Sequence, residues 1–429
     1  MTYEETIEFL YGQLPAYHRV GKAAYKDDLG NTVILDDHLG RPHKKYMKIH
    51  VAGTNGKGSV SHMIASVLQE AGYRTGLYTS PHIRDFRERI RINGKMIAEQ
   101  DVIDFVQDNM SILEEVHPSF FEMTVAMALN YFAVNRVDVA IIEVGLGGRL
   151  DSTNIIDPVL SVITNIGHDH MDLLGDTLEK VAGEKAGIIK RGRPVVISES
   201  QPESENVFKA RAAEKDSAIF FADRMFSCRL DNSYGLNPER KYEIIETATG
   251  RITQGVTSLT GDYQAANLKA VFASFAVLRD FFKLGKNHLL KGVRNVVVNT
   301  GLEGRWQVVA HNPLVICDTG HNPEGLKYVI NQLASLNKDK LHVVAGFVSD
   351  KDTDSVLPLF PADAIYYFTK ASVPRAMDEL ILMKAGAAYG LRGKAYSNVG
   401  SALSAALNNA GVNDVIFVGG STFVVADIL

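Results

Sequence analysis

The sequence predicts an α/β protein with a large N-terminal domain built on a mostly parallel sheet, followed by a smaller C-terminal α/β domain. Short apolar runs alternate with segments of helical periodicity, which is typical of parallel sheets covered by helices. The chain has 429 residues, which is too long for a single domain with one ordinary hydrophobic core. The alternation is interrupted and restarts, so we place the two domains at residues 1–297 and 298–429.

The N-terminal series begins with the run MKIHVAG (47–53), a candidate buried strand, and the apolar residues after it recur at helical spacing up to Gly72. Continuously apolar, β-branched runs predict four further strands, at 75–80, 137–145, 158–166 and 193–198. Amphipathic patterns predict helices at 99–116, 122–135, 177–190 and 262–282. The stretch 218–260 is polar and irregular, with short alternating strands and no chemistry that we can name.

The C-terminal series has the strand, loop and helix order of a Rossmann-like domain. It opens with PLVICDTGHNPEG (313–325), which predicts a strand, a loop and the start of a helix. Further strands are predicted at 341–347, 365–369 and 414–420. Between the two series, KGVRNVVVNTGLEGR (291–305) gives mixed signals.

Composition excludes several classes of protein. With 46% hydrophobic and 22% charged residues and a net charge of −5, the chain has an ordinary globular composition that argues against nucleic acid as a partner. The two cysteines lie far apart in apolar contexts and predict no disulfide framework. The N-terminus lacks a signal-peptide pattern, and no apolar run approaches the roughly 20 residues of a membrane span. We therefore expect a cytoplasmic protein with a small ligand and no membrane partner.

The stretch VAGTNGKGSV (51–60) is a variant of the phosphate-binding pattern G-x-x-x-x-G-K-[ST]. Val51 stands where the first glycine belongs, and Gly58 stands where the hydroxyl belongs. A strand, a glycine loop and a helix still bring backbone N–H groups and a helix N-terminus to one place, and Lys57 adds a cation. The loop predicts a polyphosphate site, with a tight turn bearing an exposed lysine as the alternative.

The displaced hydroxyl leaves the magnesium ligand open, because Mg²⁺ needs hard oxygen donors. Ser59 is one candidate. Thr79 and Ser80, at the end of the next strand, are others, since the carboxyl ends of parallel strands share one edge of the sheet.

Two more strand ends belong to this edge. Glu143 ends a hydrophobic strand, where a carboxylate is costly unless it meets a cation, either a metal or Arg149 in a salt bridge. His168, Asp169 and His170 follow the next strand and suggest metal binding or acid–base chemistry.

Seven motifs in this order and spacing resemble the folylpolyglutamate synthase/dihydrofolate synthase family, which is related to the Mur ligases. They are GTNGKGS, YTSPH, EVGLGGRLDSTN, HDHMDLLG, GEKAGIIK, DTGHNPEG and SDKD. The resemblance covers nearly the whole chain, although residues 200–260 match weakly. For this family the departure from the standard phosphate loop is normal.

The resemblance implies an ATP-dependent amide ligase that adds L-glutamate to a folate, with or without activity on dihydropteroate. The acceptor carboxylate would attack the γ-phosphate of ATP, and the glutamate amine would then displace phosphate from the acyl phosphate. Substrates would be the folate or dihydropteroate, L-glutamate and ATP. We expect a monomer whose C-terminal domain closes over ATP, two Mg²⁺ sites, and an open question over a monovalent cation.

The resemblance also implies a set of site residues. The expected ATP-binding residues are Thr54, Asn55, Gly56, Lys57, Gly58, Ser59, Gln264, Asn267, Arg305 and Asp318. Ser80 and Glu143 would hold one Mg²⁺, whereas His170 and a carbamylated Lys185 would hold the second. His321 would act in catalysis together with Lys185 and His170. Ser59 then becomes a phosphate contact.

Several of these assignments have structural alternatives. Lys185 could instead pair with Glu184 or Asp169 on a helix face, and Asp318 could cap a helix. The expected folate-binding residues are Phe121, Glu122, Thr124, Arg84 and Asp151, where 121–124 could equally be an ordinary helix start. The arginines around Arg84 could form a solvated face. The loops at 351–352 and 372–375 also match the family, and we expect them to serve the glutamate side or the structure.

Two other functions compete with the folate ligase. One is a Mur-type amino-acid ligase acting on a UDP-linked peptide, which we disfavour because only about 45 residues precede the first strand. The other is a non-catalytic nucleotide-switch protein that retains the ATP site and tolerates loss of Lys185 and His170.

Overall fold

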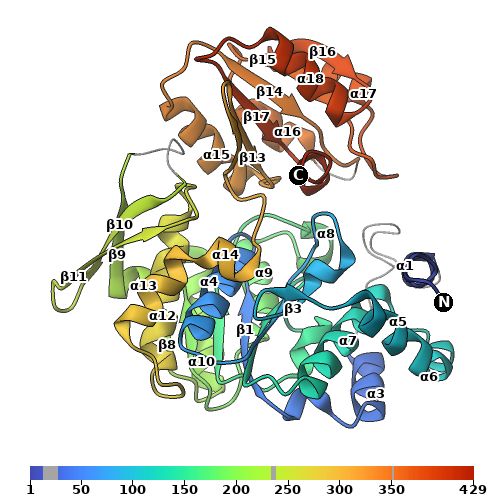
Figure 1. Cartoon of the computed structure of the whole chain (residues 1–429). Helices are drawn as coiled ribbons and strands as arrows, with labels where there is room; N and C mark the ends of the chain where they lie inside the picture. The colour runs from blue at the N-terminus through green and yellow to red at the C-terminus, as the bar shows by residue number, and fades with distance from the viewer. Residues whose placement is uncertain (13–27, 233–237, 350–351) are drawn as a thin grey trace. The chain divides into compact units, whose positions relative to one another are not determined.

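A computed structural model describes residues 1–12, 28–232, 238–349 and 352–429, and the chain forms two compact units (Figure 1). Unit 1 contains residues 1–229, 243–255 and 265–301, and unit 2 contains residues 230–242, 256–264 and 302–429. The chain thus enters unit 2 in two short excursions before it leaves unit 1 at Gly301. The domain boundary between residues 297 and 298 stays a prediction.

Unit 1 is built on an eight-stranded sheet with the order β4-β3-β2-β5-β1-β6-β7-β8. Its strands are β1 (Met47–Ala52), β2 (Thr75–Tyr78), β3 (Ile90–Ile92), β4 (Lys95–Met96), β5 (Val139–Glu143), β6 (Leu160–Ile163), β7 (Val195–Ile197) and β8 (Ile219–Phe221). Six neighbouring strands of the sheet, β2, β5, β1, β6, β7 and β8, are parallel to one another. Strands β3 and β4 extend the sheet beyond β2 and are antiparallel. The five predicted strands are confirmed, and their apolar runs are buried because helices cover the sheet.

The helices of unit 1 pack on this sheet in several groups. They include α1 (Tyr3–Gly12), α3 (Gly30–His38), α4 (Lys57–Glu70), α5 (Glu99–Asp108), α6 (Met110–Val116), α7 (Phe120–Val134), α9 (Leu178–Ala186), α10 (Pro202–Glu214), α12 (Gln264–Leu278), α13 (Lys286–Arg294) and α14 (Val296–Thr300). Helix α4 contacts β1, β2 and β5 and is covered by α13. Helix α7 shares a core with β2 and β5, and α9 and α10 share another with β6 and β7.

The segment 99–116 is helical as predicted, but it is divided into two helices. Helices α5 and α6 meet at Asn109, whose side-chain Nδ2 donates to the carbonyl of Phe105 at 2.7 Å. An asparagine amide that bonds to the preceding turn competes with the backbone and interrupts the helix. The mixed stretch 291–305 contains the end of α13 and the short α14, which stops at Gly301 in a left-handed conformation with φ 67°.

Unit 2 contains a six-stranded sheet with the order β12-β13-β17-β14-β15-β16. Its strands are β12 (Gln307–His311), β13 (Leu314–Asp318), β14 (Leu341–Ala345), β15 (Ile365–Thr369), β16 (Arg392–Tyr396) and β17 (Val415–Gly419). Only β12 runs antiparallel. Its main helices are α15 (Pro323–Ser335), α17 (Glu379–Ala387), α18 (Val399–Asn409) and α19 (Thr422–Ala426). The two-domain α/β fold class is confirmed.

A small three-stranded sheet accounts for the irregular stretch 218–260. It consists of β9 (Phe226–Leu230), β10 (Arg240–Glu246) and β11 (Ile252–Thr257), in the order β11-β10-β9. None of the helices in the described ranges is both long enough and apolar enough to cross a membrane.

Candidate active site

The loop between β1 and α4 is held by the segment that follows β6. The backbone N–H of Thr54 donates to the carbonyl of Asn165 at 2.8 Å, and the N–H of Asn55 donates to the Asn165 side chain at 2.8 Å. The hydroxyl of Thr164 donates to the carbonyl of Asn55 at 2.6 Å. These contacts fix the conformation of the loop, and neither partner residue, Thr164 or Asn165, is identified as such by the sequence.

Two glycines permit this conformation. Gly53 has φ 147°, and a Cβ there would lie 1.8 Å from the Thr164 hydroxyl. Gly56 has φ 86°, and a Cβ there would lie 2.3 Å from the Asn267 side-chain oxygen. The loop therefore needs glycine at both positions for conformation and for space. Asn267 of α12 lies against the loop, and its nucleotide contact stays a prediction.

Two lysines converge on one carbonyl of the loop. Lys57 Nζ donates to the carbonyl oxygens of Gly53 at 3.0 Å and Thr54 at 3.1 Å, and Lys185 Nζ donates to Gly53 at 3.0 Å. Lys185 is only 4% exposed, and burial, followed by the charge of Lys57, lowers its pKa to about 7. A large fraction of this amine is therefore neutral near pH 7 and able to act as a nucleophile.

The alternative ion pair of Lys185 with Glu184 is not formed. The Glu184 carboxylate accepts from the guanidinium of Arg149, at 2.9 Å from Nη2. Arg149, which the sequence suggested as a salt-bridge partner of Glu143, therefore pairs with Glu184 instead. The same ion pair argues against a Lys185–Glu184 pair and against an Arg149–Glu143 pair.

Glu143 and Ser80 both lie at the carboxyl edge of the sheet. Glu143 is 4% exposed and lies opposite Val51, the penultimate residue of β1. Ser80 follows two residues after the end of β2, which pairs with β5. A buried carboxylate and a hydroxyl at neighbouring strand ends are ligand types that suit a Mg²⁺ ion, which takes its other ligands from water and phosphate.

His170 has a left-handed backbone, with φ 52°, and its Nε2 lies 3.9 Å from Asp169 Oδ2. Within the described ranges, no three or more His, Cys, Asp or Glu side chains gather in a way that could hold a metal.

Three of the five expected folate residues make local hydrogen bonds inside the protein. Glu122 Oε2 accepts from the N–H of Ser119 at 2.6 Å and completes the N-terminal cap of α7. Thr124 donates to the carbonyl of Phe120 at 2.6 Å. Asp151 accepts from the N–H groups of Gly145, Leu146 and Thr153 at 2.8–3.0 Å, and from the Thr153 hydroxyl. These side chains shape the region around the site.

Phe121 has the most suitable geometry for a ring contact. It is partly buried, and a Cβ at Gly145 would lie 2.4 Å from its Cζ. Its ring centroid lies 6.1 Å from that of Tyr78. The glycine turn after β5 thus makes room for an aromatic ring close to Glu143.

In unit 2, Asp318 at the end of β13 joins three segments. Its carboxylate accepts from the hydroxyl of Tyr263 at 2.6 Å and from the N–H groups of Trp306 and Gly320, each at 2.7 Å. It is 2% exposed, and burial raises its pKa even though these donors act in the opposite direction. The cap of α15 is Asn322, which accepts from the N–H of Gly325 at 2.9 Å, so Asp318 does not cap this helix.

Arg305 directly precedes Trp306, whose N–H donates to Asp318, and His321 lies three residues after Asp318. Arg305 Nη1 donates to the Thr319 hydroxyl, and His321 Nδ1 lies 3.0 Å from the Thr319 carbonyl. A carbonyl only accepts, so Nδ1 carries the proton and Nε2 points to other partners. Gln264 and Asn267, on the first turn of α12, are both buried.

The loops expected on the glutamate side are partly defined. Asp352 caps the short α16 (Thr353–Val356), and Ser372 bonds to the Asp427 carboxylate through its N–H and hydroxyl. Lys351 lies outside the described residues.

Comparison with known proteins agrees with this arrangement. Residues 51–275 match the Mur ligase middle domain, and residues 304–422 match the glutamate ligase domain of Mur ligases. The dihydrofolate synthase/folylpolyglutamate synthase of Bacillus subtilis is 33% identical, over 99% of this chain and 98% of its own length. The folylpolyglutamate synthase of Lacticaseibacillus casei is also 33% identical, over 98% and 96%. The chain belongs to the folylpolyglutamate synthase/dihydrofolate synthase family.

Solved structures of the family superpose over the whole chain. Escherichia coli FolC in complex with DHPP and ADP has a TM-score of 0.85 at 27% identity, covering 100% of this chain and 97% of that one. Mycobacterium tuberculosis folylpolyglutamate synthase with ADP has a TM-score of 0.86 at 29% identity, covering 99% and 97%. As a member of this family, the chain is an enzyme, an ATP-dependent acid–amino-acid ligase.

Proposed function

We propose that the protein adds L-glutamate to a folate. An acceptor carboxylate oxygen attacks the γ-phosphorus of ATP, forming an acyl phosphate and releasing ADP. The glutamate amine then attacks the acyl carbon, and the tetrahedral intermediate loses phosphate and a proton to give the amide. The observation that carries the proposal is the convergence of Lys57 and the buried Lys185 on Gly53, beside the strand end that bears Glu143.

The phosphate loop would hold the β- and γ-phosphates of ATP. Its N–H groups and the N-terminus of α4 supply oriented dipoles, and Lys57 supplies a cation. The remaining loop contacts are proposed for Thr54, Asn55, Gly56, Gly58 and Ser59. The relatives that were solved with ADP or AMPPCP support ATP as the nucleotide.

Ser80 and Glu143 would hold one Mg²⁺, and His170 and a carbamate on Lys185 would hold a second. When bound, the metal ions would offset the negative charge that accumulates on the phosphates and the acyl oxygen. Lys185 suits carbamylation, because its neutral nitrogen can attack CO₂ and lose a proton, which leaves an anionic oxygen. Its pKa of about 7 supports this role.

In unit 2, we assign Arg305 to an ATP phosphate, Asp318 to the nucleotide loop and His321 to catalysis. Nε2 of His321 is the atom that can exchange a proton or accept a hydrogen bond, because Nδ1 donates to Thr319. Gln264 and Asn267 are proposed nucleotide contacts.

On the folate side, we propose that Phe121 stacks on the pterin ring and that Arg84 contacts the anionic tail. The side chains of Glu122, Thr124 and Asp151 bond to nearby backbone groups, so we propose that they shape the folate site and do not contact the folate directly. Dihydropteroate is proposed as a second acceptor, because relatives that match 99% and 88% of this chain carry both names. We further propose that the enzyme is a cytoplasmic monomer.

A labelled-glutamate assay tests the function. Purified protein with ATP, Mg²⁺, radiolabelled glutamate and either dihydropteroate or tetrahydrofolate should form labelled product with at least one acceptor. Omitting ATP should abolish product formation, and omitting K⁺ tests the monovalent cation. Labelling of a UDP-linked peptide with neither folate acceptor used would support the Mur-type alternative. No incorporation with any acceptor would leave the switch protein as the better hypothesis.

A further inference from the structure

The segment that follows β7 is anchored on both sides of Glu199. The hydroxyl of Ser198 donates to the carbonyl of Ala266 on α12 at 3.2 Å. Ser200 donates to the Asp223 carboxylate through its N–H at 2.7 Å and through its hydroxyl at 2.9 Å. The two serines therefore fix the backbone that carries Glu199.

This segment lies at the carboxyl edge of the sheet, close to the phosphate loop. The order β1-β6-β7 puts β7 two strands, roughly 10 Å, from β1. Ala266 directly precedes Asn267, whose side-chain oxygen would lie 2.3 Å from a Cβ at Gly56. The first turn of α12 thus contacts both the phosphate loop and the segment after β7. Because ligands of parallel sheets bind at the carboxyl ends of the strands, a nucleotide whose phosphates occupy the loop can place its base at this segment.

The Glu199 carboxylate is withdrawn from water without a donor. It is partly buried, and burial raises its pKa, although the positive charge of Lys269 acts in the opposite direction. In the parts of the chain that the structure describes, neither a hydrogen bond nor an ion pair reaches this carboxylate. Removing a carboxylate from water without a donor is costly. A ligand that donates a hydrogen bond would offset this cost.

The neighbouring acidic side chains differ from Glu199. Asp223 already accepts the two hydrogen bonds described above. Glu205 forms an ion pair with Arg224, and Glu203 is exposed on the first turn of α10. Glu199 is the member of this group that is both partly buried and without a protein donor.

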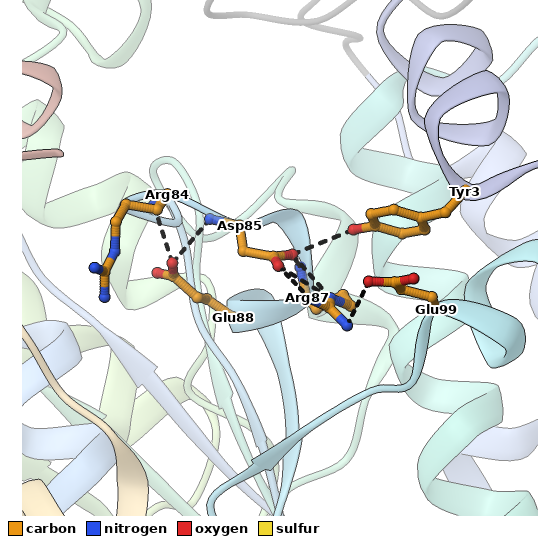
Figure 2. A network of polar contacts seen from close by, with 6 residues as sticks. All are labelled: Tyr3, Arg84, Asp85, Arg87, Glu88 and Glu99. Atoms are coloured by element: carbon orange, nitrogen blue, oxygen red, sulfur yellow. Dashed lines mark hydrogen bonds and ion pairs between the residues drawn. The ribbon is translucent and has the colours of Figure 1, made fainter. Parts of the chain in front are cut away.

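The β2–β3 loop shows how the protein satisfies a carboxylate that serves its own fold. Glu88 accepts from the N–H groups of Ile83, Arg84 and Asp85 at 2.8–2.9 Å (Figure 2). Glu199 follows a strand of the same sheet but has no such donors, so its placement points to an external one.

We propose that Glu199 recognises the base of the nucleotide and selects adenine over guanine. Its carboxylate accepts a hydrogen bond from the 6-amino group of adenine. Guanine has a carbonyl oxygen at this position, which only accepts hydrogen bonds and is repelled by the carboxylate. The inference rests on the proposed nucleotide site at the β1–α4 loop, and it adds the residue that determines base specificity.

Titration calorimetry of Glu199→Gln with ATP and with GTP, in the absence of any folate, measures this selectivity. The amide keeps the size of the side chain, but it is uncharged and can donate to the guanine oxygen. We expect the wild type to bind ATP more tightly than GTP. The variant should lose at least about tenfold of this preference, because a hydrogen bond to a charged group is replaced by a neutral one that either base can form.

A nucleotide analogue separates a direct contact from a general effect on the fold. Purine riboside 5′-triphosphate keeps the ring and the phosphates but lacks the 6-amino group. The wild type should bind it about tenfold more weakly than ATP. Glu199→Ala should bind the two nearly equally, because both changes remove the same interaction. Glu203→Gln is the matched control: it makes the same chemical change at an exposed carboxylate and should leave all three Kd values unchanged.

The outcomes are distinguishable. If the wild type binds ATP but incorporates no glutamate with any acceptor, the proposed function fails while the Kd values still test the base contact. If the wild type does not bind ATP, the nucleotide site and the base contact fail together. Equal Kd values for ATP and purine riboside 5′-triphosphate in the wild type would refute the role of Glu199, as would an unchanged preference for ATP over GTP in Glu199→Gln. Should Glu199→Gln fail to fold, the analogue comparison with Glu199→Ala decides alone.

Discussion

Each of the two large sheets carries a strand–loop–helix unit at its carboxyl edge, and the two loops are filled in opposite ways. The loop from β1 to α4 contains no carboxylate, and two lysines bond to its Gly53 carbonyl. The loop from β13 to α15 contains the buried Asp318, which accepts from three protein donors. The two units have similar topology, but the β1–α4 loop is suited to bind an external anion, whereas the β13–α15 loop has an internal anion, the Asp318 carboxylate.

The two helix N-termini differ in the same sense. Helix α15 begins with Asn322, whose side chain accepts from the N–H of Gly325. Helix α4 begins after Gly56, which has no side chain to serve as a cap. The first N–H groups of a helix need an acceptor. The N-terminus of α4 is therefore suited to phosphate, whereas at the N-terminus of α15 the Asn322 side chain already accepts one of these hydrogen bonds.

The largest expected effect on this comparison comes from Lys185→Ala, which removes one of the two lysines that bond to the first loop. We expect kcat to fall by about 10²–10³-fold, the scale of losing one group that stabilises developing charge. Steady-state glutamate incorporation measures the loss, and ¹³C NMR with labelled bicarbonate tests for the carbamate in the wild type.

Lys180→Ala is the matched control, because Lys180 lies on the same helix but is exposed and pairs with Asp176 at 2.7 Å. It should retain nearly full activity. Partial recovery of Lys185→Ala by added short carboxylates would support the carbamate. Near-normal activity of Lys185→Ala would exclude a catalytic role for this lysine.

A smaller effect is expected from Gly56→Ala. The added Cβ would lie 2.3 Å from Asn267 Oδ1, at a residue with φ 86°. The loop and α12 must then move apart, and we expect the KM for ATP to rise by roughly 10-fold or more, equivalent to about 1.4 kcal/mol of lost binding.

Gly72→Ala provides the control for backbone strain. Gly72 has φ 87° at the end of the same helix, with nothing within 4 Å of a Cβ. It should cost stability but leave the KM for ATP unchanged. If both variants raised this KM equally, strain in the helix rather than contact with Asn267 would explain the result, and Asn267→Ala would then fail to rescue Gly56→Ala.

The fold was largely predictable from the sequence because the central strands are continuous apolar runs. Among the strands that were missed, β12 and β16 are edges of their sheet, and their residues alternate in burial or are exposed. Strand β3 lies between β2 and the two-residue β4, in a segment dominated by arginines. An edge strand resembles a loop in sequence, since only one of its sides meets the sheet.

The site was predictable as a set of motifs but not as a set of contacts. Asp151 follows a glycine turn at a strand end, as a ligand-binding carboxylate would, but backbone amides surround it. The sequence does not show which donors will face a carboxylate. Tyr263 and Asp318 are 55 residues apart, and nothing local to either residue indicates that they bond.

Tyr263→Phe should have the smallest effect and tests the second loop. It removes the hydroxyl that donates to Asp318 at 2.6 Å but leaves the two backbone donors in place. We expect a loss of about 1–2 kcal/mol in the free energy of unfolding, measured by chemical denaturation. The KM for ATP should rise only a few-fold, because Asp318 still holds Trp306, which has a left-handed backbone with φ 48° next to Arg305.

Tyr366→Phe separates these two consequences. The Tyr366 hydroxyl also donates at 2.6 Å, to the carbonyl of Pro361, in the same unit but away from the Asp318 loop. Removing it should lower stability to a similar degree and leave the KM for ATP unchanged. If the two tyrosine variants behaved alike in both measurements, Asp318 would be a structural carboxylate only. Arg305 would then owe its position to the Thr319 contact rather than to the internal anion of the second loop.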